Sequence, residues 1–221
     1  MSQQQWTAVD RYLVDQLVPS DPALDEALRS TDVAGLPAIE VSPLLGKLLH
    51  LLARIQGAKR ILELGTLGGY STIWLARALP AGGKLITLEA DPKHAKVAAA
   101  NIARADQAAK VEIRLGPALE TLPKLLQEDP TPFDMIFIDA DKPNNPVYLE
   151  WALRLSRPGT ILIFDNVVRD GAVIDSSDPD PTVRGTRTLH ERLASNPRLD
   201  ATALQTVGSK GYDGFALAIV R

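Results

Sequence analysis

The chain has 221 residues, 45% of them hydrophobic, which is enough to bury a full core as one domain. Its formal net charge of -3 provides no broad basic surface for a phosphate backbone, so nucleic acid is not an expected partner. Cysteine is absent, which excludes disulfides, thiolate metal sites and cysteine nucleophiles. The first residues lack the basic start and apolar run of a secretory signal, and no apolar stretch could span a bilayer, so we expect a cytoplasmic protein that does not enter membranes.

Residues 1–58 are expected to form a helical cap. Apolar residues recur at helical spacing in residues 4–17, and Asp21-Pro22 is typical of the cap and first turn of a second helix. Ser42-Pro43 opens a third helix, residues 44–55, which is apolar around most of its surface. Such a wide apolar face predicts burial on two sides, against the sheet and against a second copy in a homodimer.

Residues 59–221 are expected to form a Rossmann-like core that shares a single domain with the cap. Strand and helix patterns alternate here, which is typical of a doubly wound α/β sheet. We expect five strands, followed in turn by helices, at residues 60–64, 84–89, 111–115, 133–138 and 160–164. Two last strands, 199–206 and 214–220, have too short a connection for a helical crossover. The predicted sheet is therefore mostly parallel, with an antiparallel last strand.

Residues 169–185 interrupt this order. The segment is rich in glycine, aspartate, serine and proline, and it shows neither helical nor strand periodicity. A polar loop of this length predicts a lid over a ligand site.

A glycine-rich turn, residues 65–69, follows the first strand. Glycines let a backbone approach a ligand closely, although they also ease the packing of a helix on a strand. Glu89 ends the second strand, where an acid is placed to accept hydrogen bonds from ribose hydroxyls. The two features together predict a cofactor that carries a nucleoside. Glu63, just before the turn, would repel a pyrophosphate and favour a cofactor with cationic groups.

Three oxygen-bearing side chains follow two strands that we expect to be neighbours: Asp139 after the fourth strand, and Asp165 and Asn166 after the fifth. Such oxygens suit Mg²⁺, Mn²⁺ or Ca²⁺ rather than zinc. Aspartates often cap turns, but three such groups at adjacent strand ends favour a metal site. Lys142 is then either a solvated surface lysine or a base, and Asp141 is expected to support the loop.

The three histidines have no ligand spacing between them. His50, His94 and His190 each fall in a different predicted helix. We therefore expect them to be structural or surface residues.

These segments resemble the cation-dependent, S-adenosylmethionine-using O-methyltransferases, the group that includes catechol and caffeoyl-coenzyme A O-methyltransferases. The resemblance covers nearly the whole chain. It rests on Leu62-Glu-Leu-Gly-Thr-Leu-Gly-Gly-Tyr-Ser71, Leu115-Gly-Pro-Ala-Leu-Glu-Thr-Leu122, Phe137-Ile-Asp-Ala-Asp-Lys142 and Asp165-Asn166. It implies S-adenosylmethionine and Mg²⁺, or Mn²⁺ or Ca²⁺, as cofactors, a homodimer, and methylation of one hydroxyl of a small ortho-dihydroxy aromatic such as a catechol, a caffeoyl-type acid or a flavonoid.

The resemblance also assigns residues to roles. Asp139, Asp165 and Asn166 match the metal ligands, and Lys142 matches the general base. Within the cofactor site, Glu89 would hold the ribose hydroxyls and Ala118 would lie beside the adenine. The full set implied to bind the cofactor is Val41, Glu63, Gly65, Tyr70, Ser71, Glu89, Ala118 and Asp139.

The carboxyl-terminal region departs from the family pattern. The animal catechol enzymes orient their substrate with a glutamate near the carboxyl end, and residues 208–214 contain none. Lys210, Tyr212 and Asp213 are the candidate replacements.

Two alternative functions stay open. Some members of this family methylate a hydroxyuridine in transfer RNA, which the net negative charge of this chain disfavours. A non-catalytic cofactor-binding module is the other alternative. The combination of a metal set with Lys142 favours an enzyme, because a binding protein needs no base.

Overall fold

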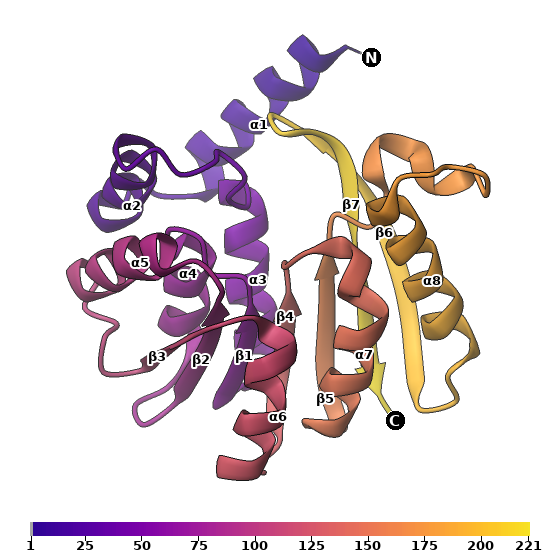
Figure 1. The fold of residues 1–221 in the computed structure, drawn as a ribbon. Helices are drawn as coiled ribbons and strands as arrows, with labels where there is room; N and C mark the ends of the chain where they lie inside the picture. The colour runs from indigo at the N-terminus through magenta and orange to yellow at the C-terminus, as the bar shows by residue number, and fades with distance from the viewer. Residues whose placement is uncertain (1) are drawn as a thin grey trace.

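The computed structural model describes residues 2–221, which fold around one seven-stranded sheet (Figure 1). The strands are β1 Arg60–Leu64, β2 Lys84–Glu89, β3 Val111–Leu115, β4 Phe133–Ile138, β5 Ser156–Asp165, β6 Leu199–Gly208 and β7 Gly211–Val220. Their order is β3-β2-β1-β4-β5-β7-β6. Strands β1 to β5 pair in parallel, and β7 runs antiparallel to both β5 and β6. The predicted doubly wound sheet with an antiparallel last strand is confirmed.

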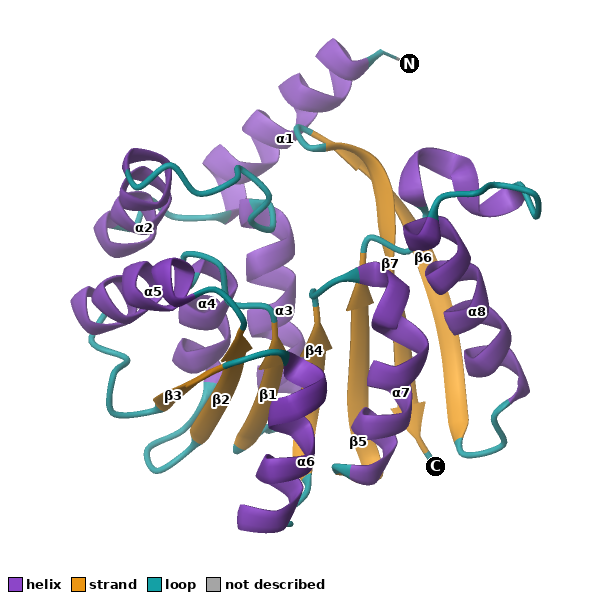
Figure 2. Ribbon diagram, in the orientation of Figure 1, coloured by secondary structure: helices purple, strands orange, loops and turns teal. Residues whose placement is uncertain are grey.

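Helices cover both faces of the sheet (Figure 2). They are α1 Gln3–Leu17, α2 Pro22–Val33, α3 Pro43–Gln56, α4 Tyr70–Ala78, α5 Pro92–Arg104, α6 Ala118–Glu128, α7 Asn145–Arg154 and α8 Pro181–Ser195, with 3-10 helices η1 Lys142–Asn144 and η2 Arg169–Ile174. Helices α2, α3, α5 and α8 each begin with an Asp or Ser cap followed by proline. The cap oxygen accepts a free backbone N–H and proline fixes the first turn, which explains why these boundaries were predictable. Within residues 2–221, no helix has the length and apolar character needed to cross a membrane.

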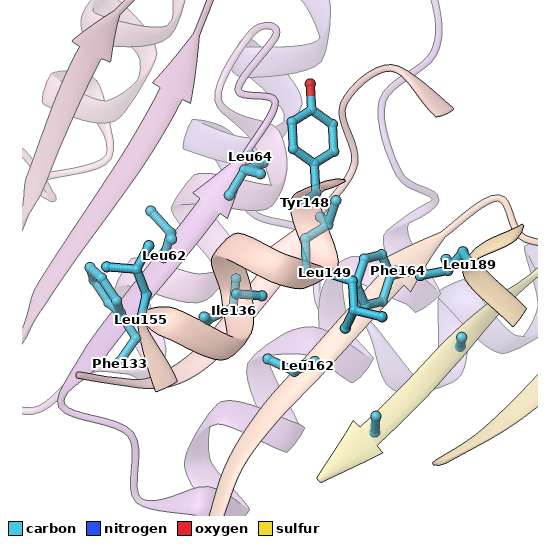
Figure 3. Close-up of a cluster of buried hydrophobic side chains, with 14 of the residues drawn as sticks. Leu62, Leu64, Phe133, Ile136, Tyr148, Leu149, Leu155, Leu162, Phe164 and Leu189 are labelled. Atoms are coloured by element: carbon cyan, nitrogen blue, oxygen red, sulfur yellow. The ribbon is translucent and has the colours of Figure 1, made fainter. Parts of the chain in front are cut away.

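The buried apolar residues form one cluster on each face of the sheet. Helices α6, α7 and α8 pack over one cluster, and α3, α4 and α5 over the other. Figure 3 shows the first cluster, in which Leu62 and Leu64 of β1 face inward beside Ile136 of β4. Ile61 belongs to the opposite cluster, because successive side chains of a strand point to opposite faces. The same alternation directs Glu63 of β1 toward α4.

The carboxyl-terminal hairpin is longer than predicted. We expected residues 207–213 to be a connection, but β6 and β7 stay paired until a turn at Ser209 and Lys210. The tip is held by α1, since Ser209 N donates to Asp10 Oδ2 at 2.7 Å and Gln3 Nε2 donates to the Gly208 carbonyl at 2.9 Å. These contacts lie about two hundred residues apart in the sequence, so no local pattern could indicate them.

Candidate functional site

The main cavity, of about 580 Å³, lies at the carboxyl ends of the central parallel strands. Its walls include the turn after β1, the end of β2 and the segment after β4, with Leu28 and Thr31 of α2 on the cap side. Ligands bind at this edge in open α/β sheets, and the volume is suitable for a small molecule. Of the predicted cofactor residues, the wall includes Val41, Gly65, Tyr70, Ser71, Glu89, Ala118 and Asp139.

Two glycines of the turn are required by close contacts. Gly65 has φ +93°, and a Cβ there would lie 2.4 Å from the Asp139 carbonyl oxygen. A Cβ on Gly68 would lie 1.9 Å from Thr31 Oγ1 of α2. Any side chain at either position would therefore push the turn away from β4 or from the cap. The turn is also held from α5, where Asn101 Nδ2 donates to the Gly68 carbonyl at 2.9 Å.

Glu63 does not line the cavity, which corrects the expectation for this residue. Its side chain is fully buried and three hydroxyl groups enclose the carboxylate. Ser71 Oγ donates to Oε1 at 2.6 Å, and Thr72 and Thr87 donate to Oε2 at 2.5 and 2.7 Å. Ser71 lines the cavity and donates to Glu63, so it stands between this carboxylate and the cavity.

Burial dominates the electrostatics of Glu63. Loss of water around the carboxylate raises its pKa from 4.5 to about 7, although the hydroxyl donors oppose this shift. The negative charge of Asp139 raises the pKa further. A cation in the adjoining cavity would therefore favour the charged form of Glu63.

Glu89 is fixed at the end of β2 by backbone donors. Its Oε2 accepts from Thr66 N at 3.1 Å and Leu67 N at 2.8 Å, and Oε1 accepts from Asp91 N at 3.0 Å. His94 Nδ1 lies 3.5 Å from Glu89 Oε1 and its ring lines the same cavity. His94 thus stays a residue for which we predict a structural or surface role, and the structure adds that it borders the cavity beside Glu89. The cap Asp91 and Pro92 start α5 so that His94, the third residue of the helix, lies back over Glu89, and this short spacing could have indicated the contact.

The predicted metal and base residues gather where β4 and β5 end. Lys142 is buried, and its Nζ donates to Asp139 Oδ1 at 2.7 Å. Asn166 lies in the left-handed region at φ 54°, and its side chain makes no hydrogen bond within residues 2–221. Burial and the charge of Asp139 raise the pKa of Asp165 from 3.8 to about 7, while Lys142 lowers it.

This donor set fits a hard divalent cation. Within residues 2–221 no group of three His, Cys, Asp or Glu side chains is placed to hold a metal ion, so a cation bound here would take a third protein oxygen from a residue such as Asn166. Two carboxylates and one amide offer the oxygen atoms that Mg²⁺, Mn²⁺ or Ca²⁺ prefer. Burial is the main cause of the raised pKa of Asp165, and the charge of Asp139 adds to it while Lys142 opposes it.

Asp141 supports the loop that carries Lys142, as predicted. Its carboxylate accepts hydrogen bonds from Tyr148 and, at 2.5 Å, from Asn144 Nδ2. Figure 3 shows the Tyr148 hydroxyl pointing away from the buried cluster around its ring. Loss of water and the charge of Asp141 raise the pKa of Tyr148 above its usual range. Helix α8 also packs against this loop: a Cβ on Gly185 would lie 2.4 Å from the Lys142 carbonyl oxygen.

A second cavity, of about 480 Å³, adjoins the first. It contains Asp165 and the hairpin residues Lys210, Tyr212 and Asp213, so the three candidate replacements lie on one side of the site. Its apolar lining consists mainly of Ile39, Val41, Leu44, Leu45, Leu48, Val207 and Phe215.

The expected lid is only partly a wall of the site. Within residues 169–185, Arg169 and Asp170 are the residues that line one or both of these two cavities. The rest is occupied by η2, by a short turn and by the start of α8, and Arg187 of α8 holds η2 by donating to the Val173 carbonyl. Sequence reasoning gave Arg169 no role, although its place three residues after Asn166 indicates that it lies near the strand end.

The family model for O-methyltransferases matches residues 15–219. The chain belongs to the O-methyltransferase family. A catechol O-methyltransferase from Niastella koreensis is 57% identical over 221 residues, covering all of both chains. The crystal structure of a Bacillus cereus O-methyltransferase in complex with S-adenosylhomocysteine has a TM-score of 0.98 and 58% identity, with full coverage of both chains. A Streptomyces achromogenes O-methyltransferase of tomaymycin synthesis, solved with S-adenosylmethionine, has a TM-score of 0.96 and 51% identity, covering 100% of this chain and 99% of that one.

This protein is therefore a member of an enzyme family whose solved relatives hold S-adenosylmethionine or its demethylated product. The family assignment confirms an S-adenosylmethionine-dependent O-methyltransferase and decides against a non-catalytic binding module. Glu63 is the most completely buried acid of this O-methyltransferase, and its raised pKa can be tested through the pH dependence of stability.

Replacing Glu63 with Gln should change how stability depends on pH. Between pH 4.5 and about 7 the unfolded carboxyl has lost its proton while the folded one keeps it, so the unfolding free energy of the wild type falls as pH rises. Glu63→Gln cannot titrate, and its stability relative to the wild type should rise across this range. Urea unfolding at several pH values measures the difference, and a constant difference would contradict the raised pKa.

Proposed function

We propose that this protein is a divalent-metal-dependent O-methyltransferase that methylates one hydroxyl of a small ortho-dihydroxy aromatic. The observation that carries the proposal is the gathering of Asp139, Lys142, Asp165 and Asn166 at the ends of two neighbouring strands, beside the cofactor cavity. The name of the Niastella koreensis relative, catechol O-methyltransferase, supports the substrate class.

Asp139, Asp165 and Asn166 are the residues that would hold the metal. Bound there, Mg²⁺ would lower the pKa of hydroxyl groups placed beside it. The relation to the two cavities supports this position, because Asn166 lines both of them, Asp139 lines the first and Asp165 lines the second. A diol held between the cavities would have its hydroxyls toward the cofactor and its ring toward the apolar lining.

Lys142 is proposed to accept the proton from the hydroxyl that is methylated. Its Nζ lies 2.7 Å from Asp139 Oδ1 and is largely shielded from bulk water; as a neutral amine it would take the proton and become the ammonium that pairs with Asp139. Loss of that proton would leave an oxyanion, which would attack the sulfonium methyl carbon of S-adenosylmethionine; the C–O bond forms as the C–S bond breaks, and S-adenosylhomocysteine leaves. The enzyme accelerates this step by holding oxygen and methyl in line.

The cofactor is proposed to lie along the first cavity. Glu89 would accept hydrogen bonds from the ribose hydroxyls and Ala118 would flank the adenine, while Tyr70, Ser71 and Val41 would surround the methionine end. Glu63 would supply negative charge behind Ser71. This charge would favour binding of the cationic cofactor over binding of an uncharged analogue.

Incubation with S-adenosylmethionine and Mg²⁺ should add one methyl group to catechol, caffeate or a flavonoid diol, measured by mass spectrometry. EDTA should abolish the transfer and excess Mg²⁺ should restore it, because the hydroxyl groups lose the cation that promotes their ionisation. The same screen includes transfer RNA bearing hydroxyuridine. Methylation of that RNA without turnover of any diol would replace the proposed substrate class, and full activity in EDTA would exclude the metal.

Lys142→Ala should lower kcat by about two to four orders of magnitude, the usual contribution of a general base, with little change in the Kd of S-adenosylmethionine. Lys142→Arg is the matched control, since it keeps a cation beside Asp139 but cannot accept a proton. Both variants should be slow. Near-normal turnover of Lys142→Arg would show that Lys142 serves only as a positive charge.

We also propose that two copies associate through α3 and α1. The apolar face of α3 is only partly covered in one chain, and Ile55 and Leu51 are 80% and 41% exposed. Tyr12 of the adjacent helix α1 is 63% exposed. An exposed apolar area spread over two neighbouring helices is typical of an interaction surface.

Sedimentation equilibrium should give the mass of two chains, and Ile55→Glu should shift the protein toward the monomer because it places a charge in the apolar contact. Val33→Glu is the control, since Val33 is 73% exposed but lies on α2. A monomeric wild type, or equal effects of both variants, would reject this surface.

A further inference from the structure

The two cavities share part of their walls, and one of the shared side chains is cationic. Ile39, Glu40, Val41, Asn166 and Arg169 line both cavities. Arg169 follows Asn166 by three residues, at the start of η2. It therefore lies beside the proposed metal position, at the passage from the cofactor cavity to the apolar second cavity.

The guanidinium of Arg169 has donors without partners. Its Nε is buried and has no hydrogen-bond partner within residues 2–221. The nearest carboxylate, Asp213, lies 3.9 Å from Nη1, which is too far for a hydrogen bond. The side chain as a whole is 30% exposed, and neither Nη1 nor Nη2 makes a hydrogen bond within residues 2–221, so these two nitrogens can donate to an acceptor bound in the cavity.

The carboxylates around Arg169 accept their hydrogen bonds from other donors, although Asp213 Oδ2 forms a long ion pair with Nη1 at 3.9 Å. Asp213 Oδ1 accepts from the backbone N–H groups of Val168, Arg169 and Gly214 at 2.8 to 3.0 Å, which fixes the turn after β5. Asp180 caps α8 by accepting from Thr182 N at 2.7 Å. Neither acid therefore saturates the guanidinium.

Lys210, the other cation of the second cavity, is already paired. Its Nζ lies 2.6 Å from Glu40 Oε1 and 3.1 Å from the Ala38 carbonyl oxygen. Of the remaining acids of this cavity, Asp10 accepts from Ser209 N, Asp165 accepts from Asn166 N, and Asp170 is exposed to solvent. Arg169 is thus the cation in this wall with hydrogen-bonding capacity left for a ligand.

We propose that Arg169 binds a carboxylate carried by the aromatic diol, so that the enzyme prefers diols with an anionic side chain over neutral diols of the same size. The planar guanidinium matches the two oxygens of a carboxylate. This inference rests on the proposed function, because it assumes that the hydroxyls of the diol lie at Asp139, Asp165 and Asn166.

The methionine carboxylate of the cofactor is the other possible source of such an anion. The second cavity favours the substrate, because Arg169 opens into it while Gly65, Tyr70 and Ser71 of the cofactor turn do not line it. The two sources predict different measurements: a substrate contact changes selectivity among diols, and a cofactor contact changes the Kd of S-adenosylmethionine.

The proposal is tested by measuring kcat/KM of the full-length enzyme for caffeate and for caffeamide. The two diols differ only in that caffeamide has a neutral amide in place of the carboxylate. The wild type should have the higher kcat/KM for caffeate. Arg169→Gln should lower the caffeate-to-caffeamide ratio of kcat/KM about tenfold, the loss expected for one charge-assisted hydrogen bond. Arg169→Lys, which keeps the charge, should give an intermediate ratio. The Kd of S-adenosylmethionine, from calorimetry, should not change.

Arg29→Gln is the matched control, since it makes the same substitution in an exposed ion pair with Glu26 that lines neither cavity, and its ratio should equal that of the wild type. A wild-type ratio of one or less overturns the proposal even if Arg169→Gln does not fold. An unchanged caffeate-to-caffeamide ratio in Arg169→Gln also overturns it. If that variant keeps the ratio but binds S-adenosylmethionine more weakly, Arg169 contacts the carboxylate of the cofactor instead. Failure of the wild type to methylate catechol, caffeate and caffeamide alike would instead reject the proposed function.

Discussion

The close approach of the backbone at Gly65 and Asp139 is the constraint on which the site depends. Asp139 N donates to the Leu64 carbonyl at 2.8 Å, and the space beside Gly65 would not admit a methyl group. Because β1 and β4 are neighbouring parallel strands, the glycine-rich turn after β1 and the segment after β4 that carries Lys142 begin side by side at the same edge of the sheet. A shift of either strand by one residue would direct Glu63 to the other face and separate the two halves of the site.

Negative charge gathers around this approach. Burial and neighbouring charge raise the pKa values of Glu63 and Asp165 to about 7, and Asp139 contributes to both shifts. These acids are held in place by hydroxyl groups or by the strand ends, so they cannot move to water to relieve the repulsion. The site is therefore electrostatically complementary to cations, and both the sulfonium cofactor and a divalent metal are cationic.

The second cavity is built from the two ends of the chain. The hairpin of β6 and β7 reaches α1 through Ser209 and the loop before α3 through Lys210. Gly208 permits this contact, since a Cβ there would lie 2.4 Å from Asp10 Oδ2. Lys210 thus holds the cavity wall together, and this structural use of the lysine leaves Arg169 as the cation available to a substrate.

The sequence by itself determined the order of strands and helices, the glycine turn, and the positions of Glu89, Asp139, Lys142, Asp165 and Asn166 at strand ends, because periodicity, caps and motifs are local. It could not determine which residues meet across the sheet. Only the tertiary structure placed Glu63 behind Ser71, brought His94 to Glu89, extended the hairpin to α1, and left the Arg169 guanidinium without a hydrogen-bond partner between two cavities. Each of these depends on side-chain direction and on contacts between distant segments, which hydrophobic pattern alone does not encode.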